Sequence, residues 1–417
     1  MSETAAALDL RVRVLRSRTP LELEYLPDAR LRVDANGRVI CIEDGAGAAA
    51  ALDLRAEGVL TPGYVDTHLH FPQTRCMGRA TGPLLDWLKE SIFPEEARFA
   101  DLNYARTVAS AFVRAQLSAG TTDSLIYGSV HAEAVGVLFE RLEAAGLRAV
   151  AGPALMERDA PEAICRGVEA SMQGLSELHE NWHQKADGRL RLAVLPRFAL
   201  SCDAPLLDAA GRFANEHGLL VSTHIAETRR EYELACQRFR AAAYLEVYER
   251  FGLVHERTVL AHCIYLSPRE WRRLVRARAV VSHCADSNDF LGSGSMPTAA
   301  VLQAGTRIAL GSDVAAGRGF AMAAHAAAAY DNALRRGLRL SSARLFWWLT
   351  QGGSEALGNS ESGRLAQGQW ADMAMRPCEA LPGDDVESVA SRLLFDPHSA
   401  GATRVWVAGR ECLTTQG

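Results

Sequence analysis

The chain has 417 residues, which is more than one small domain needs and enough for a large barrel with an accessory module. Hydrophobic side chains make up 48% of the sequence, so a large core can form. The formal net charge of −5 argues against a protein that captures nucleic acid or an anionic membrane electrostatically, and it suits a small, nearly neutral substrate.

Cysteine usage and the N-terminal sequence indicate a cytoplasmic protein. The 9 cysteines are scattered and odd in number, without a Cys-x-x-Cys pair, which is typical of reduced thiols. The first residues, MSETAAALDLRVRV, lack the apolar run of a signal peptide. No stretch has the length of a membrane-spanning helix, so we expect no membrane partner.

Both ends of the chain have the short alternating patterns of β-strands. Residues 8–62 contain the runs LDLRVRV, LELEYL, ARLRVD and VICIED, and the Asn36-Gly37 pair is a hairpin-turn signal. The same texture returns in ADMAMRP and TRVWVAGRECL near the C-terminus. We therefore predict that residues 1–62 and 366–417 form one small β-sandwich module.

The central part, residues 63–365, alternates between strand and amphipathic helix. Eight strands are predicted, at 59–70, 121–128, 148–155, 191–198, 219–226, 258–265, 280–287 and 307–314. This order predicts an α/β fold of the (β/α)8 TIM-barrel type. A doubly wound open sheet would place a Gly-rich phosphate loop after its first strand, whereas this first strand ends in a His-x-His pair.

Candidate metal ligands stand at several of the predicted strand ends. His68 and His70 project to the same side of the first strand, although such a pair alone is a weak signal. His224, His262 and Asp313 come at the ends of the fifth, sixth and eighth strands, where barrel enzymes carry their catalytic residues. Imidazoles and a carboxylate with one open position suit Zn²⁺ or Fe²⁺.

Glu227 is the predicted proton carrier. It follows His224 by three residues, so it lies beyond the strand end and can reach a substrate instead of the metal. The alternative is a solvated loop glutamate beside Arg229 and Arg230.

The lysine count predicts a single metal. Binuclear hydrolases of this architecture often bridge two metals with a modified lysine on the fourth strand. This chain has only Lys89 and Lys185, and neither is at a predicted strand end.

The sequence resembles the amidohydrolase superfamily and, within it, the guanine deaminases. The superfamily resemblance rests on PGYVDTHLH (62–70), STHIAE (222–227), LAHCIYL (260–266) and LGSDVAAG (310–317). The closer resemblance rests on HFPQ (70–73), LLDWLKESIFPEEARF (84–99), GTTDSLIYGSVH (120–131), PRFALSC (196–202) and SNDFLGSG (287–294). Together these stretches span most of residues 60–360.

The resemblance implies a role for each matching residue. One Zn²⁺ per subunit would be held by His68, His70, His224 and Asp313, and His262 would bind or orient the attacking hydroxide. The implied catalytic residues are Glu227, Asp313 and His262, and the implied substrate-binding residues are Gln73, Arg197, Phe198 and His224. The expected reaction is hydrolysis of guanine to xanthine and ammonia by a homodimer.

At two positions this sequence has an aspartate where the family that it resembles usually has another residue. Asp286, in CADSN (284–288), adds a carboxylate near the expected pocket mouth, and Asp123 replaces a smaller residue. Asp286 leaves a related heterocycle, such as a pterin or an oxidised guanine, open as the substrate. A non-catalytic scaffold is the third alternative, but such relatives typically lose metal ligands.

The segment after the first strand and His131 each allow more than one interpretation. The segment with Trp87, Phe93 and Pro94 follows the first strand and is either a lid over the pocket or ordinary core. His131 is a candidate contact to the substrate or to a ligating residue.

Overall fold

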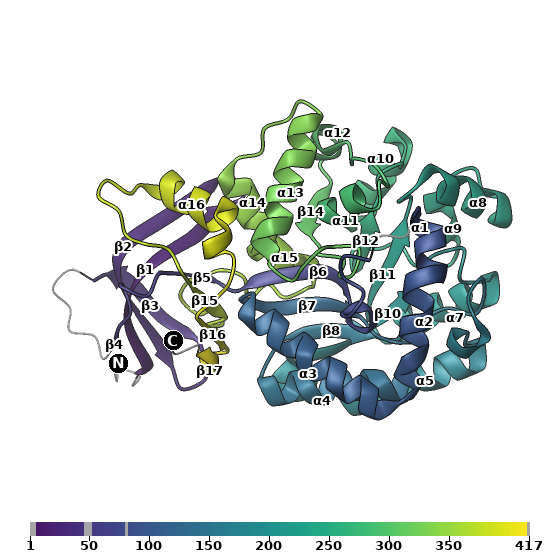
Figure 1. Ribbon diagram of the computed structural model, residues 1–417, viewed down its shortest axis with the longest axis horizontal. Helices are drawn as coiled ribbons and strands as arrows, with labels where there is room; N and C mark the ends of the chain where they lie inside the picture. The colour runs from purple at the N-terminus through teal and green to yellow at the C-terminus, as the bar shows by residue number, and fades with distance from the viewer. Residues whose placement is uncertain (1–5, 46–51, 80–81, 415–417) are drawn as a thin grey trace.

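The computed structural model describes residues 6–45, 52–79 and 82–414, which form a barrel with a smaller β-sheet beside it (Figure 1). Both described ends of the chain lie in the smaller sheet, so the predicted module built from the two termini is confirmed. Within these described ranges, no helix combines the length and the apolar character needed to cross a membrane.

The smaller sheet has strand order β17-β16-β15-β5-β1-β2-β3, with β4 paired to β1. Its strands are β1 (Ala6–Thr19), β2 (Glu22–Asp34), β3 (Val39–Asp44), β4 (Leu52–Asp53), β5 (Val59–Pro62), β15 (Met373–Arg376), β16 (Arg404–Val407) and β17 (Arg410–Thr414). Alternate residues of β1 and β2, such as Val12, Val14 and Leu31, are buried in its core with Trp406. Because hydrophobic residues alternate along these strands, they all point to one face of the sheet, and that face is the one buried in the core.

The barrel confirms the predicted (β/α)8 architecture. Its parallel strands are β6 (Tyr64–His70), β7 (Thr121–Tyr127), β8 (Ala149–Gly152), β10 (Leu190–Pro196), β11 (Leu220–Ile225), β12 (Thr258–His262), β13 (Val280–His283) and β14 (Arg307–Leu310), with the short β9 (Ala154–Leu155) paired to β10. At the closure, Thr67 Oγ1 donates to the carbonyl oxygen of Leu310 at 2.9 Å, and the Asp313 N–H donates to the His68 carbonyl at 2.8 Å. These contacts join the last strand and its loop to the first.

Helices surround the barrel strands in Figure 1. They are α3 (Leu102–Ser118), α4 (Ala132–Ala145), α5 (Val168–Trp182), α6 (Lys185–Gly188), α7 (Ala204–Glu216), α8 (Arg229–Phe239), α9 (Tyr244–Arg250), α10 (Pro268–Ala277), α11 (Ala285–Phe290), α12 (Thr298–Gln303), α13 (Met322–Arg335), α14 (Ser342–Leu349) and α15 (Gln351–Ala356). α16 (Val386–Phe395) lies beside β2 and α14, and short 3-10 turns occur at Phe71–Gln73, Ala97–Ala100, Glu162–Ile164 and Pro397–Ser399. Capping boxes at Thr228/Glu231 and Ser267/Glu270 begin α8 and α10.

One segment after β6 covers the end of the barrel at which the carboxyl ends of its strands lie. It consists of α1 (Leu84–Trp87), a π-helical turn (Leu88–Ile92) and α2 (Phe93–Glu96). Trp87 and Phe93 are both buried, so this segment is packed against the barrel.

The predicted limits of five strands need correction. The run 59–70 is two strands, because the chain leaves the small sheet after Pro62 and enters the barrel at Tyr64. Gly63 permits this close passage, since a Cβ there would lie 2.0 Å from Thr122 Oγ1. The sixth, seventh and eighth strands end at His262, His283 and Leu310, earlier than predicted. The predicted third strand, 148–155, is two short strands, β8 and β9. The domain boundaries at 62/63 and 365/366 stay a prediction.

Candidate active site

Four of the predicted ligands converge at one end of the barrel. His68, His70, His224 and Asp313 each offer a ligand atom, and these atoms all lie within 4.8 Å of one another. His68 and His70 share β6, His224 is the penultimate residue of β11, and Asp313 lies in the loop after β14. Parallel strands bring their carboxyl ends together, which is why residues so distant in sequence meet.

The atoms of this cluster fit a divalent metal ion. Nε2 of His70 lies 3.1 Å from Nε2 of His224, and Nε2 of His68 and of His70 lie 3.4 and 3.3 Å from Oδ1 of Asp313. Histidine nitrogens and a carboxylate oxygen facing one another are the donor set that Zn²⁺ takes in catalytic sites. Lys89 and Lys185 are both outside the cluster, and the prediction of a single metal stays a prediction.

Carbonyl oxygens orient two of the imidazoles. Nδ1 of His224 lies 2.6 Å from the Arg197 main-chain oxygen, and Nδ1 of His262 lies 2.8 Å from Oδ1 of Asn288. Because a carbonyl can only accept, both Nδ1 atoms carry the proton and both Nε2 atoms keep a free lone pair. Burial lowers the pKa of His70 to about 4 and holds that of His224 well below its ordinary value, so both rings are neutral, as a metal ligand must be.

Glu227 and His262 lie beside the candidate metal ligands. Oε2 of Glu227 is 3.5 Å from Nε2 of His262, and Oε1 accepts a hydrogen bond from Ser293 Oγ at 2.7 Å. The alternative of a solvated loop glutamate is wrong, since Glu227 is only 3% exposed. Burial, and then the negative charge of Asp313, raise the pKa of Glu227 to about 8 despite the Ser293 hydrogen bond.

The backbone is strained where these residues leave their strands. Ala226, His262 and Asp313 have φ values of 53°, 68° and 51°, in the left-handed region that non-glycine residues avoid. Such conformations are common at active sites, where surrounding contacts fix an unfavourable geometry.

Gln73 and Arg197 lie in the same small pocket as the cluster. The pocket is lined by His70, Gln73, Leu84, Trp87, Leu88, Arg197, Phe198, His224, Glu227, Glu231, His262, Leu291, Asp313 and Ala316. Its open volume is only about 30 Å³, because the α1–α2 segment packs over it with Trp87 and Leu88. All of the predicted substrate-binding residues are therefore brought together in one pocket.

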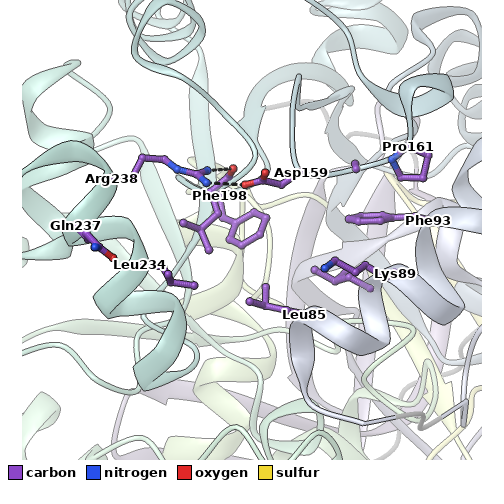
Figure 2. Close-up of a pocket in the computed structure, with 12 residues that line it drawn as sticks. Leu85, Lys89, Phe93, Asp159, Pro161, Phe198, Leu234, Gln237 and Arg238 are labelled. Atoms are coloured by element: carbon purple, nitrogen blue, oxygen red, sulfur yellow. Dashed lines mark hydrogen bonds and ion pairs between the residues drawn. The ribbon is translucent and has the colours of Figure 1, made fainter.

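A larger cavity of about 750 Å³ adjoins this pocket, and the two share Leu88 and Phe198 as lining residues (Figure 2). In Figure 2, Phe93 and Lys89 face it from the α1–α2 segment, and Leu234 and Gln237 face it from α8. Asp159 and Arg238 form an ion pair of 2.8 Å at its edge. We name this cavity the vestibule.

Three residues singled out in the sequence lie outside the pocket lining. Asp286 is held by Arg318, whose main-chain N–H and Nε donate to it at 2.8 and 2.9 Å. Nδ1 of His131 accepts a hydrogen bond from Nη2 of Arg166 at 2.9 Å in a separate cavity. Asp123 lines a polar cavity with Arg148 and Arg191. None of them contributes to the lining of the catalytic pocket.

Four polar residues that complete the site received no role in the sequence analysis. Ser287 Oγ donates to Asp313 at 2.5 Å, while Asn288 and Ser293 contact His262 and Glu227 as described above. Glu96 bonds both Gln73 and Arg197. All four fall in the stretches 84–99 and 287–294, so the resemblance marked the segments without indicating what these residues contact.

Comparisons with known proteins agree with this geometry. The pattern of the Amidohydrolase family matches residues 59–412. Guanine deaminase of Escherichia coli (strain K12) is 35% identical over 327 residues, covering 78% of this chain and 74% of that protein. A probable guanine deaminase of Deinococcus radiodurans is 40% identical over 375 residues, covering 86% and 84%. This chain belongs to the amidohydrolase family, among the guanine deaminases.

A solved structure extends the likeness of this amidohydrolase to the whole fold. The guanine deaminase of C. acetobutylicum, with guanine bound in its active site, superimposes with a TM-score of 0.90 at 25% identity. The match covers 97% of this chain and 99% of that one. The family is metal-dependent, and a cluster that can hold a metal ion is present here in His68, His70, His224 and Asp313. The last three of these also line the pocket, whereas His68 lies behind its lining.

Proposed function

We propose that this amidohydrolase removes the 2-amino group of guanine by hydrolysis, giving xanthine and ammonia, with one Zn²⁺ per subunit. One observation carries the proposal: Gln73 and Arg197 line the same pocket as His70, His224 and Asp313. The pocket thus combines polar groups that can bind a purine with a cluster that can hold a hydrolytic metal. The guanine bound in the C. acetobutylicum relative supports the same substrate class.

His68, His70, His224 and Asp313 would hold the metal. When bound, the ion would supply a Lewis acid that makes water acidic enough to attack at neutral pH. Zn²⁺ suits neutral imidazoles with a carboxylate, and Fe²⁺ is compatible with the same ligands.

Glu227 and Asp313 would move the protons. Asp313 accepts the proton that water loses as its oxygen bonds to C2, and Glu227 donates a proton to the ring nitrogen N3. His262 orients the attacking water through its free Nε2, which lies 3.5 Å from Glu227 and 3.9 Å from Asp313. Asp313 then gives its proton to the departing amino group, and the C2 hydroxyl returns a proton to Glu227 as the C2–N bond breaks, so water and guanine become xanthine and ammonia and both carboxyl groups regain their starting state.

The pocket polarity suits the oxo purine. A guanidinium such as that of Arg197 is a strong donor to the 6-oxo group, and the amide of Gln73 can donate and accept. Phe198 is buried and lines the pocket, where its ring can pack on the base.

An ultraviolet assay of guanine conversion to xanthine tests the proposal. The protein as purified should convert guanine with release of ammonia, and a chelator should abolish the conversion. A panel with a pterin and an 8-oxidised guanine distinguishes a related heterocycle as the substrate. If one of those compounds is turned over and guanine is not, the proposal is wrong.

Two further parts of the proposal concern the whole protein. We infer a homodimer and a cytoplasmic location, in keeping with the resemblance and with the scattered cysteines. Light scattering of purified protein at micromolar concentration measures the first, and fractionation of the source cells measures the second.

A further inference from the structure

Glu96 is a buried carboxylate directly behind the substrate pocket. It ends α2 and is 4% exposed, yet it is absent from the pocket lining, so it contacts the pocket only through other side chains. Its oxygens accept from Nη1 of Arg197 at 2.7 and 2.9 Å and from Nε2 of Gln73 at 3.0 Å. A buried charge persists only when it is paired and hydrogen-bonded in this way.

The amide of Gln73 is held in one orientation by two neighbours. Nε2 donates to Glu96, which as a carboxylate can only accept, and Oε1 accepts from the N–H of Ala315 at 3.2 Å. Rotating the amide by 180° would oppose two acceptors at Glu96 and two donors at Ala315. Gln73 therefore keeps one N–H and one lone pair for the substrate, and their positions cannot exchange.

Arg197 is constrained by the same carboxylate. One terminal nitrogen is committed to Glu96, which fixes the plane of the guanidinium and neutralises its charge. The remaining nitrogens can only donate, so the pocket presents a fixed order of donors and acceptors.

Guanine and 2,6-diaminopurine differ in the order of hydrogen-bond donors and acceptors along the edge formed by N1 and position 6. Both carry the 2-amino group at the carbon that reacts, but guanine has an acceptor at position 6 and a donor at N1, whereas 2,6-diaminopurine has the reverse. We propose that Glu96 is a positioning residue that sets the selectivity for the 6-oxo purine by locking Gln73 and Arg197. This inference rests on the proposed deamination of guanine.

The isosteric variant Glu96→Gln tests the inference. An amide has one acceptor oxygen where the carboxylate has two, so an N–H group would face either Gln73 or Arg197. We expect kcat/KM for guanine to fall by about tenfold to a hundredfold, and the preference for guanine over 2,6-diaminopurine to narrow by about tenfold. Metal content should not change, because Glu96 is outside the metal cluster.

Glu95→Gln is the matched control. Glu95 is the adjacent residue, is 6% exposed and bonds Tyr104 and Arg98, away from the pocket lining. The Glu95→Gln variant should leave the ratio of kcat/KM for guanine to kcat/KM for 2,6-diaminopurine unchanged. If the Glu96→Gln variant does not fold, Glu96→Asp keeps the negative charge while withdrawing the carboxylate, and the same narrowing is expected.

A double-mutant cycle shows whether Glu96 acts through Gln73. In a Gln73→Ala background, Glu96→Gln should change the substrate ratio less than it does in the native chain. The inference is overturned if Glu96→Gln lowers kcat/KM for guanine and for 2,6-diaminopurine by the same factor, or if it changes neither value. Failure of the native protein to deaminate guanine would instead refute the proposed function, so the two failures are distinguishable.

Discussion

The main-chain carbonyl oxygen of Arg197 accepts a hydrogen bond of 2.6 Å from Nδ1 of His224, while its side chain lines the substrate pocket. The residue directly after β10 therefore orients a candidate metal ligand on β11 and, in the proposed function, would also bind the substrate. Partners of this kind fix the tautomer and the direction of a ligating imidazole. Any displacement of Arg197 should consequently affect both the metal and the purine.

Metal removal should abolish activity without unfolding the protein. The cluster lies at the end of a barrel whose core is hydrophobic, so the fold does not depend on the ion. We expect a chelator to reduce turnover below detection, with unchanged circular dichroism, and stoichiometric Zn²⁺ to restore it. Elemental analysis should give one metal per chain. A binding ratio of two would refute the prediction of a single metal.

Glu227→Gln should reduce kcat by about a hundredfold to ten-thousandfold with full metal occupancy, since the amide cannot carry the proton. Steady-state kinetics and elemental analysis on one sample measure both quantities. Leu291→Val, which changes an apolar lining residue by one methylene, serves as the control for pocket packing. Near-normal turnover by Glu227→Gln would exclude its role as the proton carrier.

Asp286→Thr should lower stability and leave substrate preference unchanged. Asp286 holds the main chain and side chain of Arg318, in the loop that follows Asp313, and does not line the catalytic pocket. We expect a loss of about 1–2 kcal/mol in the free energy of unfolding, measured by denaturant titration. A changed ratio of guanine to pterin turnover would instead show that Asp286 acts on the substrate.

Leu88→Trp should slow substrate capture. Leu88 belongs to the wall shared by the vestibule and the catalytic pocket, so a larger side chain there narrows the passage between them. We expect kcat/KM for guanine to fall by about tenfold or more, because the larger ring obstructs the passage to the catalytic pocket. Leu234→Trp, on the opposite vestibule wall, should have a much smaller effect. Equal losses in the two variants would contradict this route of entry.

His183 should make stability depend on pH. Burial, followed by the nearby His179, lowers its pKa to about 4, and its Nδ1 accepts from the N–H of Leu192 at 3.1 Å. The unfolded chain takes up this proton near pH 6.5 and the folded chain does not, so the contribution is present above pH 6.5 and is lost as pH falls towards 4. The Tm of His183→Gln should therefore fall less over that range than the Tm of the native protein. Parallel Tm curves would refute this.

The barrel and its candidate ligands could be predicted because their signals are local. Alternating hydrophobicity identifies the strands, and a His-x-His pair on one strand must project to one side. The strand ends were less predictable: Asp286 was expected near the pocket mouth, but β13 ends at His283 and α11 turns Asp286 towards Arg318. Hydrophobic pattern alone does not show where a strand gives way to a helix or loop.

By itself, the sequence determined which residues can bind a metal, carry a proton or bind a purine, because these capacities belong to side-chain chemistry. Only the tertiary structure decided what surrounds them. Burial of Glu227, the carbonyl that orients His224 and the carboxylate of Glu96 behind Gln73 all depend on contacts between segments distant in the chain. Their pairing comes from packing at the barrel end, which no local pattern encodes.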